Sequence, residues 1–98
     1  MPLSEKQKRD LKRQAHHLKP VVIVGQHGLS DNVHQEIDIA LSHHELIKVR
    51  VNAGDRPERA ALVAEIVQRS GSERVLEVGH IIALFRRNPD KPKITLTN

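Results

Sequence analysis

The stretch from Lys19 to Ser30 constrains the fold of this chain more than any other part of its sequence. It contains Lys-Pro, then the apolar run Val21–Val24, then the turn Gly25-Gln26-His27-Gly28 followed by Leu-Ser. Consecutive β-favouring apolar residues predict a strand that is buried on both faces, and we expect it at the centre of a sheet. Because Ser30 is a good N-cap residue, the two glycines are predicted to turn the chain from this strand into a helix.

A strand that ends in a two-glycine turn at a helix N-terminus has a chemical consequence. The first backbone N–H groups of a helix have no partners within it, and the helix dipole favours an anion at the same place. We therefore expect a phosphate of a nucleic-acid backbone to lie over Gly25–Gly28. The alternative is a purely structural turn, in which glycine is needed only because the backbone adopts a positive φ.

The charge distribution favours the interpretation that the glycine turn binds a phosphate. The chain has a formal net charge of +4 over 98 residues, and its cations are concentrated at the two ends. Residues 1–28 contain six Lys or Arg and two Asp or Glu, which gives a net charge of +4. Residues 29–82 contain six cations and nine acids, and residues 83–98 contain four cations and one acid. Such segregation predicts a polyanionic partner on one surface, provided that the two ends meet in the fold. The alternative is a solvated basic surface that only keeps the protein soluble.

The first basic region is predicted to be a helix. Ser4 is its N-cap, and Pro20 prevents it from continuing into the strand. An apolar stripe at helical spacing is formed by Leu11, Ala15 and Leu18. Because only Glu5 and Asp10 are available for ion pairs, we interpret the cationic circumference as a face that contacts phosphates and lies beside the glycine turn. The cations assigned to this face are Lys6, Lys8, Arg9, Lys12, Arg13 and Lys19.

Hydrophobic periodicity divides the rest of the chain into further helices and strands. Helices are predicted over residues 30–44 and 55–70, and strands over residues 46–51, 74–78 and 81–86. The order α-β-α-β-α-β-β defines an α/β fold with a small mixed sheet packed with helices, in one domain over residues 1–98. Within it, residues 87–98 are expected to be a loose tail or a short strand. Four further cations extend the candidate binding surface, namely Lys48, Arg50, Arg86 and Arg87.

The sequence carries no signature of an enzyme, a metal site or a cofactor. The chain has no cysteine and therefore no thiolate ligand or nucleophile. The glycine-rich phosphate-loop and dinucleotide-binding motifs are absent. The seven histidines include two adjacent pairs, whose side chains diverge on a helix instead of converging on a metal. Phe85 is the single aromatic residue, so stacking platforms for bases are excluded and we expect binding by shape and charge.

The cellular setting is predicted from what the sequence lacks. No apolar run approaches the roughly 20 residues of a membrane span, and the polar N-terminus shows no signal peptide. We therefore expect a cytoplasmic protein with no membrane partner and no small-molecule substrate. No large exposed apolar stripe is predicted, which favours a monomer.

A resemblance to a known domain family is carried by the segments Lys19–Leu29 and His44–Val49, with Ala15-His16 before them. On these segments the sequence resembles the CRM domain (chloroplast RNA splicing and ribosome maturation). The sequence is especially similar to the stand-alone bacterial YhbY-type proteins. The resemblance covers nearly the whole chain and is strongest over residues 3–51.

This resemblance implies an RNA-binding α/β domain, similar in fold to the C-terminal domain of initiation factor three, with a KH-like G-x-x-G loop. It also implies association with precursors of the large ribosomal subunit. The RNA contacts implied for the loop are Gly25, Gln26, His27 and Gly28. The interior of the loop lacks the Lys or Arg that is frequent in KH loops, which leaves phosphate binding to backbone groups and neighbouring cations.

The expected function is that of a non-catalytic protein that binds large-subunit ribosomal RNA in pre-ribosomal particles. One alternative is a protein–protein adaptor that uses the basic helix, and its binding would survive nuclease treatment. The other is a small nuclease or hydrolase that uses His27 with an acid, and His27→Ala would abolish its turnover.

Overall fold

The computed structural model describes residues 3–97, so residues 1–2 and 98 of the expected domain lie outside it. Its elements follow the predicted order α-β-α-β-α-β-β, which is confirmed. They are α1 (Glu5–Ala15), β1 (Pro20–Val24), α2 (Asp31–His44), β2 (Leu46–Val51), α3 (Arg56–Ser70), β3 (Glu73–Val78) and β4 (Ile81–Phe85).

Each helix begins at a side chain that the sequence marks as a cap. Ser4 Oγ accepts a hydrogen bond from the Gln7 N–H at 3.1 Å, and the Gln7 side chain accepts one from the Ser4 N–H at 3.0 Å. Ser30 caps α2, and Asp55 caps α3 in a second reciprocal box. These bonds satisfy donors that a helix start otherwise leaves free, so the boundaries of the helices are encoded locally.

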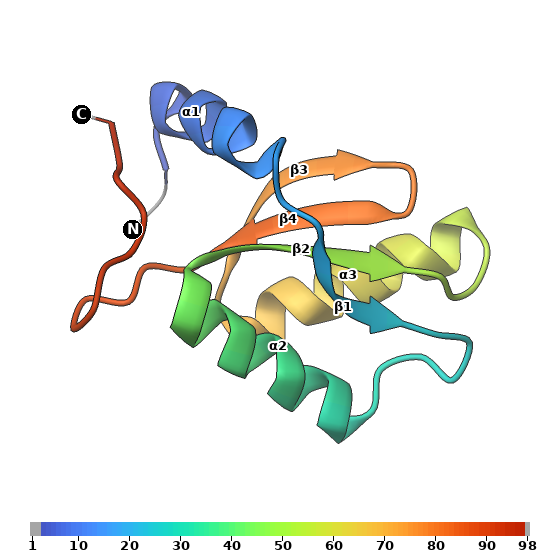
Figure 1. The fold of residues 1–98 in the computed structure, drawn as a ribbon. Coiled ribbons are helices and arrows are strands. Elements are labelled where there is room, and N and C mark those ends of the chain that lie inside the picture. Colours follow the sequence, from blue (N-terminus) through green and yellow to red (C-terminus); the bar gives the residue numbers. More distant parts are fainter. Residues whose placement is uncertain (1–2, 98) are drawn as a thin grey trace.

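The four strands form one mixed sheet in the order β1-β2-β4-β3. β1 runs parallel to β2, whereas β4 is antiparallel to both of its neighbours. Figure 1 shows α2 and α3 on one side of the sheet and α1 on the other. We call the side covered by α2 and α3 the inner face, and the side that carries α1 the outer face.

The prediction that Val21–Val24 is a central strand buried on both faces is wrong. β1 is an edge strand; Val22 and Val24 are 4% and 0% exposed, whereas Val21 and Ile23 are 53% and 60% exposed. An apolar run has the same sequence pattern in both situations, and only the coverage by other elements distinguishes them. Here α1 does not reach the outer side of β1. The sequence argument for a monomer, that no apolar stripe is exposed, therefore does not hold on this face.

The core has one cluster on each face of the sheet. The inner cluster joins β1, β2 and β4 to α2 and α3, through residues such as Val24, Ile37, Val49 and Ile66. The smaller outer cluster lies under α1 and is formed by Leu11, Ala15, Leu46, Val75, Ala83 and Phe85. The predicted alternation of β2 is confirmed, since Ile47, Val49 and Val51 are buried in the inner cluster.

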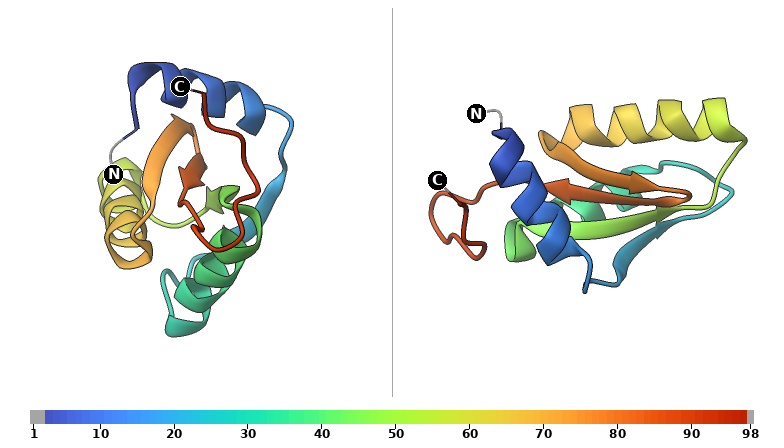
Figure 2. Two further views of the ribbon diagram at one scale, coloured as in Figure 1. Left: turned by 90° about the vertical axis from the view of Figure 1, so that its left-hand side faces the viewer. Right: turned by 90° about the horizontal axis from the view of Figure 1, so that it is seen from above.

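The C-terminal segment after β4 packs against α1, so the two basic ends of the chain meet as the charge argument required. Ile94 and Leu96 contact the outer cluster. The Gln14 side chain donates to the Thr95 carbonyl at 3.2 Å, and Thr97 Oγ1 donates to Asp10 at 3.0 Å. Residues 93–96 form no strand. Figure 2 shows the segment passing in front of the sheet and rising to α1.

Glu45 anchors this segment from the junction of α2 and β2. Its side chain is fully buried, and its carboxylate accepts hydrogen bonds from the N–H groups of Asn88 at 2.6 Å and Ile94 at 2.8 Å. It also accepts bonds from the Lys93 N–H at 2.5 Å and the Arg87 guanidinium at 3.1 Å. Burial raises the pKa of this carboxyl, but the three backbone donors and the Arg87 charge outweigh it, so the pKa is lowered.

Candidate nucleic-acid interface

The G-x-x-G turn follows β1 and leaves its glycines open to solvent on the Cβ side. The Gly28 N–H donates to the Gly25 carbonyl at 3.0 Å, and Gly28 has a φ of 76°. A Cβ atom at either glycine would meet nothing within 4 Å, so another molecule can approach the backbone closely. Among the described residues, the N–H groups of Gln26 and His27 have no protein acceptor. The turn therefore offers free donors, and the start of α2 adds its dipole.

α1 does not lie beside this turn, contrary to the prediction from charge. The helix leads into the N-terminal end of β1, whereas the G-x-x-G turn follows its C-terminal end (Figure 1). A strand of five residues separates them, which is about 16 Å at about 3.3 Å per residue. A binding surface that includes both must therefore run along the outer face of the sheet.

Two cations of β2 occupy that outer face between α1 and the turn. Lys48 and Arg50 alternate with the buried residues of β2 and so point to the outer side. Arg50 lies in a row across all four strands, because it pairs with Ile23 and Ile81, and Ile81 pairs with Val78. The view from above in Figure 2 shows that α1 leaves this part of the sheet uncovered. The outer face thus connects the basic helix to the G-x-x-G turn.

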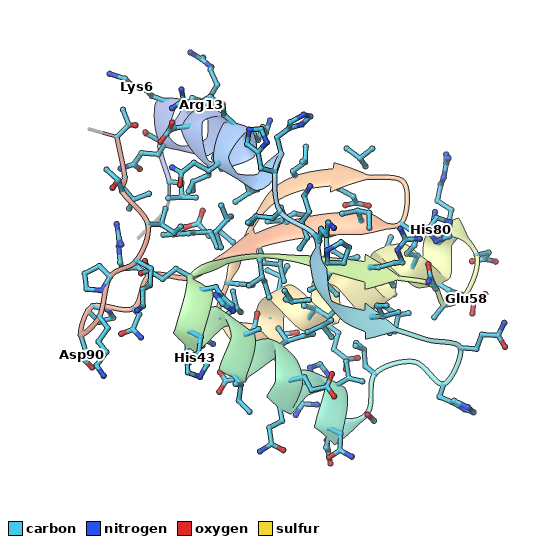
Figure 3. All side chains as sticks on the ribbon, in the orientation of Figure 1. Lys6, Arg13, His43, Glu58, His80 and Asp90 are labelled. Carbon is cyan, nitrogen blue, oxygen red and sulfur yellow. The ribbon has the colours of Figure 1, made fainter. Side chains whose placement is uncertain are left out.

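Most of the predicted cationic residues lack an acidic partner. Among residues 3–97, seven of them have no carboxylate oxygen within 4.0 Å, namely Lys6, Lys8, Arg9, Lys12, Lys19, Lys48 and Arg50. We call these seven residues the basic track. Figure 3 shows Lys6 extending from α1 into solvent. Cations without acidic partners attract a polyanion to the surface on which they lie.

The other three predicted cations form ion pairs with acidic side chains, and Arg13 does so on the exposed surface of α1. The Arg13 guanidinium pairs with Asp10, whose pKa is lowered by side-chain hydrogen bonds from Arg13, Gln14 and Thr97. Arg86 donates to the Asp38 carboxylate at 2.7 Å and to the Ser70 carbonyl at 2.9 Å.

Arg87 binds Glu45 and the Ile94 carbonyl, and its guanidinium lies 5.6 Å from the Phe85 ring centre. Arg86 and Arg87 therefore hold the C-terminal segment and α2 in place, and we leave both out of the binding surface. The sequence did not reveal this, because their acidic partners are 48 and 42 residues away.

The geometry gives little support to a hydrolase that uses His27 or to a metal site. His27 is exposed in the turn and, among the described residues, has no hydrogen bond or ion pair with an acid. No group of three or more His, Cys, Asp or Glu side chains in residues 3–97 is arranged to hold a metal ion. None of the helices in that range combines the length and the apolar character needed to cross a bilayer.

The comparison with protein families decides the identity of the domain. The model of the CRS1/YhbY (CRM) domain matches residues 3–86. The chain belongs to this family. The resemblance read from Lys19–Leu29 and His44–Val49 is thereby confirmed, and the C-terminal segment that Glu45 anchors lies just beyond the matched range.

Relatives of this CRM domain come from several bacteria. The chain is 46% identical over 94 residues to an RNA-binding protein of Haemophilus influenzae, covering 96% of this chain and 94% of that protein. It is 42% identical over 98 residues to a probable RNA-binding protein of Pseudomonas aeruginosa, covering 100% of this chain and 93% of that protein. A solution structure from Staphylococcus aureus, of a hypothetical protein put forward as RNA-binding, matches with a TM-score of 0.82 at 31% identity, covering 98% of this chain and 100% of that one. This match confirms the α/β fold class.

Proposed function

We propose that this CRM domain is a non-catalytic RNA-binding module that acts in the cytoplasm on ribosomal RNA in precursors of the large ribosomal subunit. The observation that carries the proposal is the basic track, which runs from α1 across the outer face towards the G-x-x-G turn. Phosphate contacts supply most of the affinity of such a surface for a nucleic acid. Membership of the CRM family and the relatives named as RNA-binding proteins support RNA as the partner.

The mode of recognition follows from the side chains that the surface lacks. Phe85 is only 4% exposed and lies beneath α1, so no aromatic platform is available for a row of stacked bases. Lysines, arginines and free backbone N–H groups position a nucleic acid through its phosphates and carry little sequence information. The proposed module therefore recognises mainly the shape and charge of a folded RNA.

Sedimentation of a cell lysate through a sucrose gradient tests the proposal. We expect the protein to travel with immature large subunits, and to move to the top of the gradient after ribonuclease treatment. Association that survives ribonuclease would favour the protein adaptor. Absence from the particles at low salt would contradict the ribosomal assignment.

A carboxylate in the G-x-x-G turn is expected to weaken RNA binding. Gly28→Asp should lower the affinity about fivefold to tenfold, because two like charges about 4 Å apart repel by about 1 kcal/mol in water. Gly71→Asp is a matched control, since Gly71 also has a positive φ of 65° and open space around its Cβ position. It lies at the end of α3, away from the turn. Filter binding with both variants measures the effect, and equal affinity in both would remove the turn from the site.

A further inference from the structure

A cavity opens between the end of α1, the end of α2 and the C-terminal segment, and nothing in the sequence analysis predicted it. Its volume is about 970 Å³, within the range of small-ligand sites. Its apolar walls include Leu18 and Val21, which are 38% and 53% exposed, and the buried side chains of Leu46 and Ile47. The lining residues come from α1, β1, α2, β2 and the C-terminal segment, whose ribbons are drawn in Figure 1.

Hydrogen bonds fix one wall of the cavity. Lys93 and Ile94 line it from the C-terminal segment, and their N–H groups are both bound by the buried carboxylate of Glu45. Gln14 lines it from α1 and is tied to the Thr95 carbonyl. The cavity is therefore a formed site between secondary structure elements and an anchored segment, and its shape does not depend on a free chain end.

The side chains that line the cavity favour a ligand that combines an anionic group with an apolar or aromatic group. Two lysines, Lys19 and Lys93, line the cavity from different segments, and no Asp or Glu is among the described residues that line it. His43 and His44 add two imidazole rings with centres 6.3 Å apart and planes at 53°. Figure 3 shows His43 on the last turn of α2. Imidazole rings and aliphatic side chains are surfaces on which an unstacked base can lie.

We propose that this cavity binds one unpaired nucleotide of the RNA, with its base against Leu18, Val21 and the imidazole of His43. The phosphate of that nucleotide is bound by Lys19 and Lys93. The site is continuous with the basic track, because Lys19 belongs to both. This inference rests on the proposed function and adds to it a preference for RNA with an unpaired nucleotide beside a helical region.

The test is an NMR titration of the isotope-labelled protein with uridine 5′-monophosphate. Ribose 5-phosphate and inorganic phosphate serve as probes that lack the base. We expect saturable shifts of the His43 and His44 ring signals and of the Leu18 and Ile94 amides with the nucleotide, and weaker shifts with the other two. Equal shifts with all three probes would show an anion site only and would overturn the proposal, as would absence of shifts.

Two positions on the same face of β1, two residues apart, provide a matched pair of variants. Val21 and Ile23 are both exposed on the outer face, but only Val21 lines the cavity. Val21→Glu is expected to weaken nucleotide binding at least tenfold, and Ile23→Glu is expected to leave it unchanged. An equal response of the two variants would overturn the proposal. Lys93→Glu, in the exposed C-terminal segment, is a second variant that should weaken both the nucleotide and ribose 5-phosphate.

Binding of a blunt RNA duplex separates this inference from the proposed function. The duplex has no unpaired nucleotide, so Val21→Glu should not weaken its binding more than Ile23→Glu does. Failure of the wild-type protein to bind any RNA would contradict the proposed function, whereas the nucleotide titration decides the occupant of the cavity by itself.

Discussion

Reversal of three charges on α1 is expected to weaken RNA binding by more than a hundredfold at about 0.1 M salt. The variant is Lys6→Glu, Arg9→Glu and Lys12→Glu, three exposed residues of the basic track. Each phosphate contact on a single strand contributes about 0.7 to the slope of log affinity against log salt. Loss of three contacts therefore costs about two log units at about 0.1 M salt, and the new carboxylates add repulsion. Filter binding over a range of salt concentrations should show a slope that is reduced by about 2.

A second triple variant distinguishes a local surface from the effect of net charge. Arg69→Glu, Arg74→Glu and Lys91→Glu change the net charge equally, at exposed positions outside the basic track. This control should lose only a small part of the affinity, through weaker long-range attraction. An equal loss in both triple variants would contradict a localised interface on α1. Circular dichroism and thermal melting of both proteins verify that the fold is intact.

The sequence predicted those features of the fold that depend on neighbouring residues. Ser4 with Gln7, and Asp55 with Glu58, define helix starts because each capping bond spans three residues. The inner face of β2 follows from period-two alternation in the same way. The edge position of β1 was beyond such reasoning, since Val21 and Ile23 have the same sequence pattern in an open strand and in a covered one.

The candidate site was predictable only in part, for a related reason. The cations of α1 can be identified from the sequence, because few acids lie within one helical turn of them. The separation of α1 from the G-x-x-G turn depends on the length and direction of β1 in the sheet. The structural roles of Arg86 and Arg87 depend on Asp38 and Glu45, which folding brings from a distant part of the chain. The cavity likewise needs three segments that are far apart in sequence.

Glu45→Ala is expected to destabilise the protein by about 3–5 kcal/mol, because it leaves the half-buried Arg87 charge and three backbone N–H groups without their acceptor. For a domain of this size, the thermal midpoint should fall by roughly 15 °C or more. Glu77→Ala is the control, since Glu77 forms an exposed ion pair with Arg74 at 3.3 Å and its loss should cost less than about 1 kcal/mol. Similar midpoints for the two variants would contradict the anchoring role of Glu45.

The pH dependence of stability shows whether the charge of Glu45 is responsible. Its folded pKa lies below the ordinary value of 4.5, so its contribution is fully present above pH 4.5 and is lost as the pH falls through the folded pKa. Urea unfolding of the wild type and of Glu45→Gln, which keeps the shape without the charge, should therefore differ at pH 7 and converge in acid. A difference that persists unchanged at low pH would assign the effect to packing. Glu45 also binds the N–H groups of Lys93 and Ile94, which line the cavity. Glu45→Gln should therefore open one wall of the cavity and weaken nucleotide binding under conditions where the fold persists.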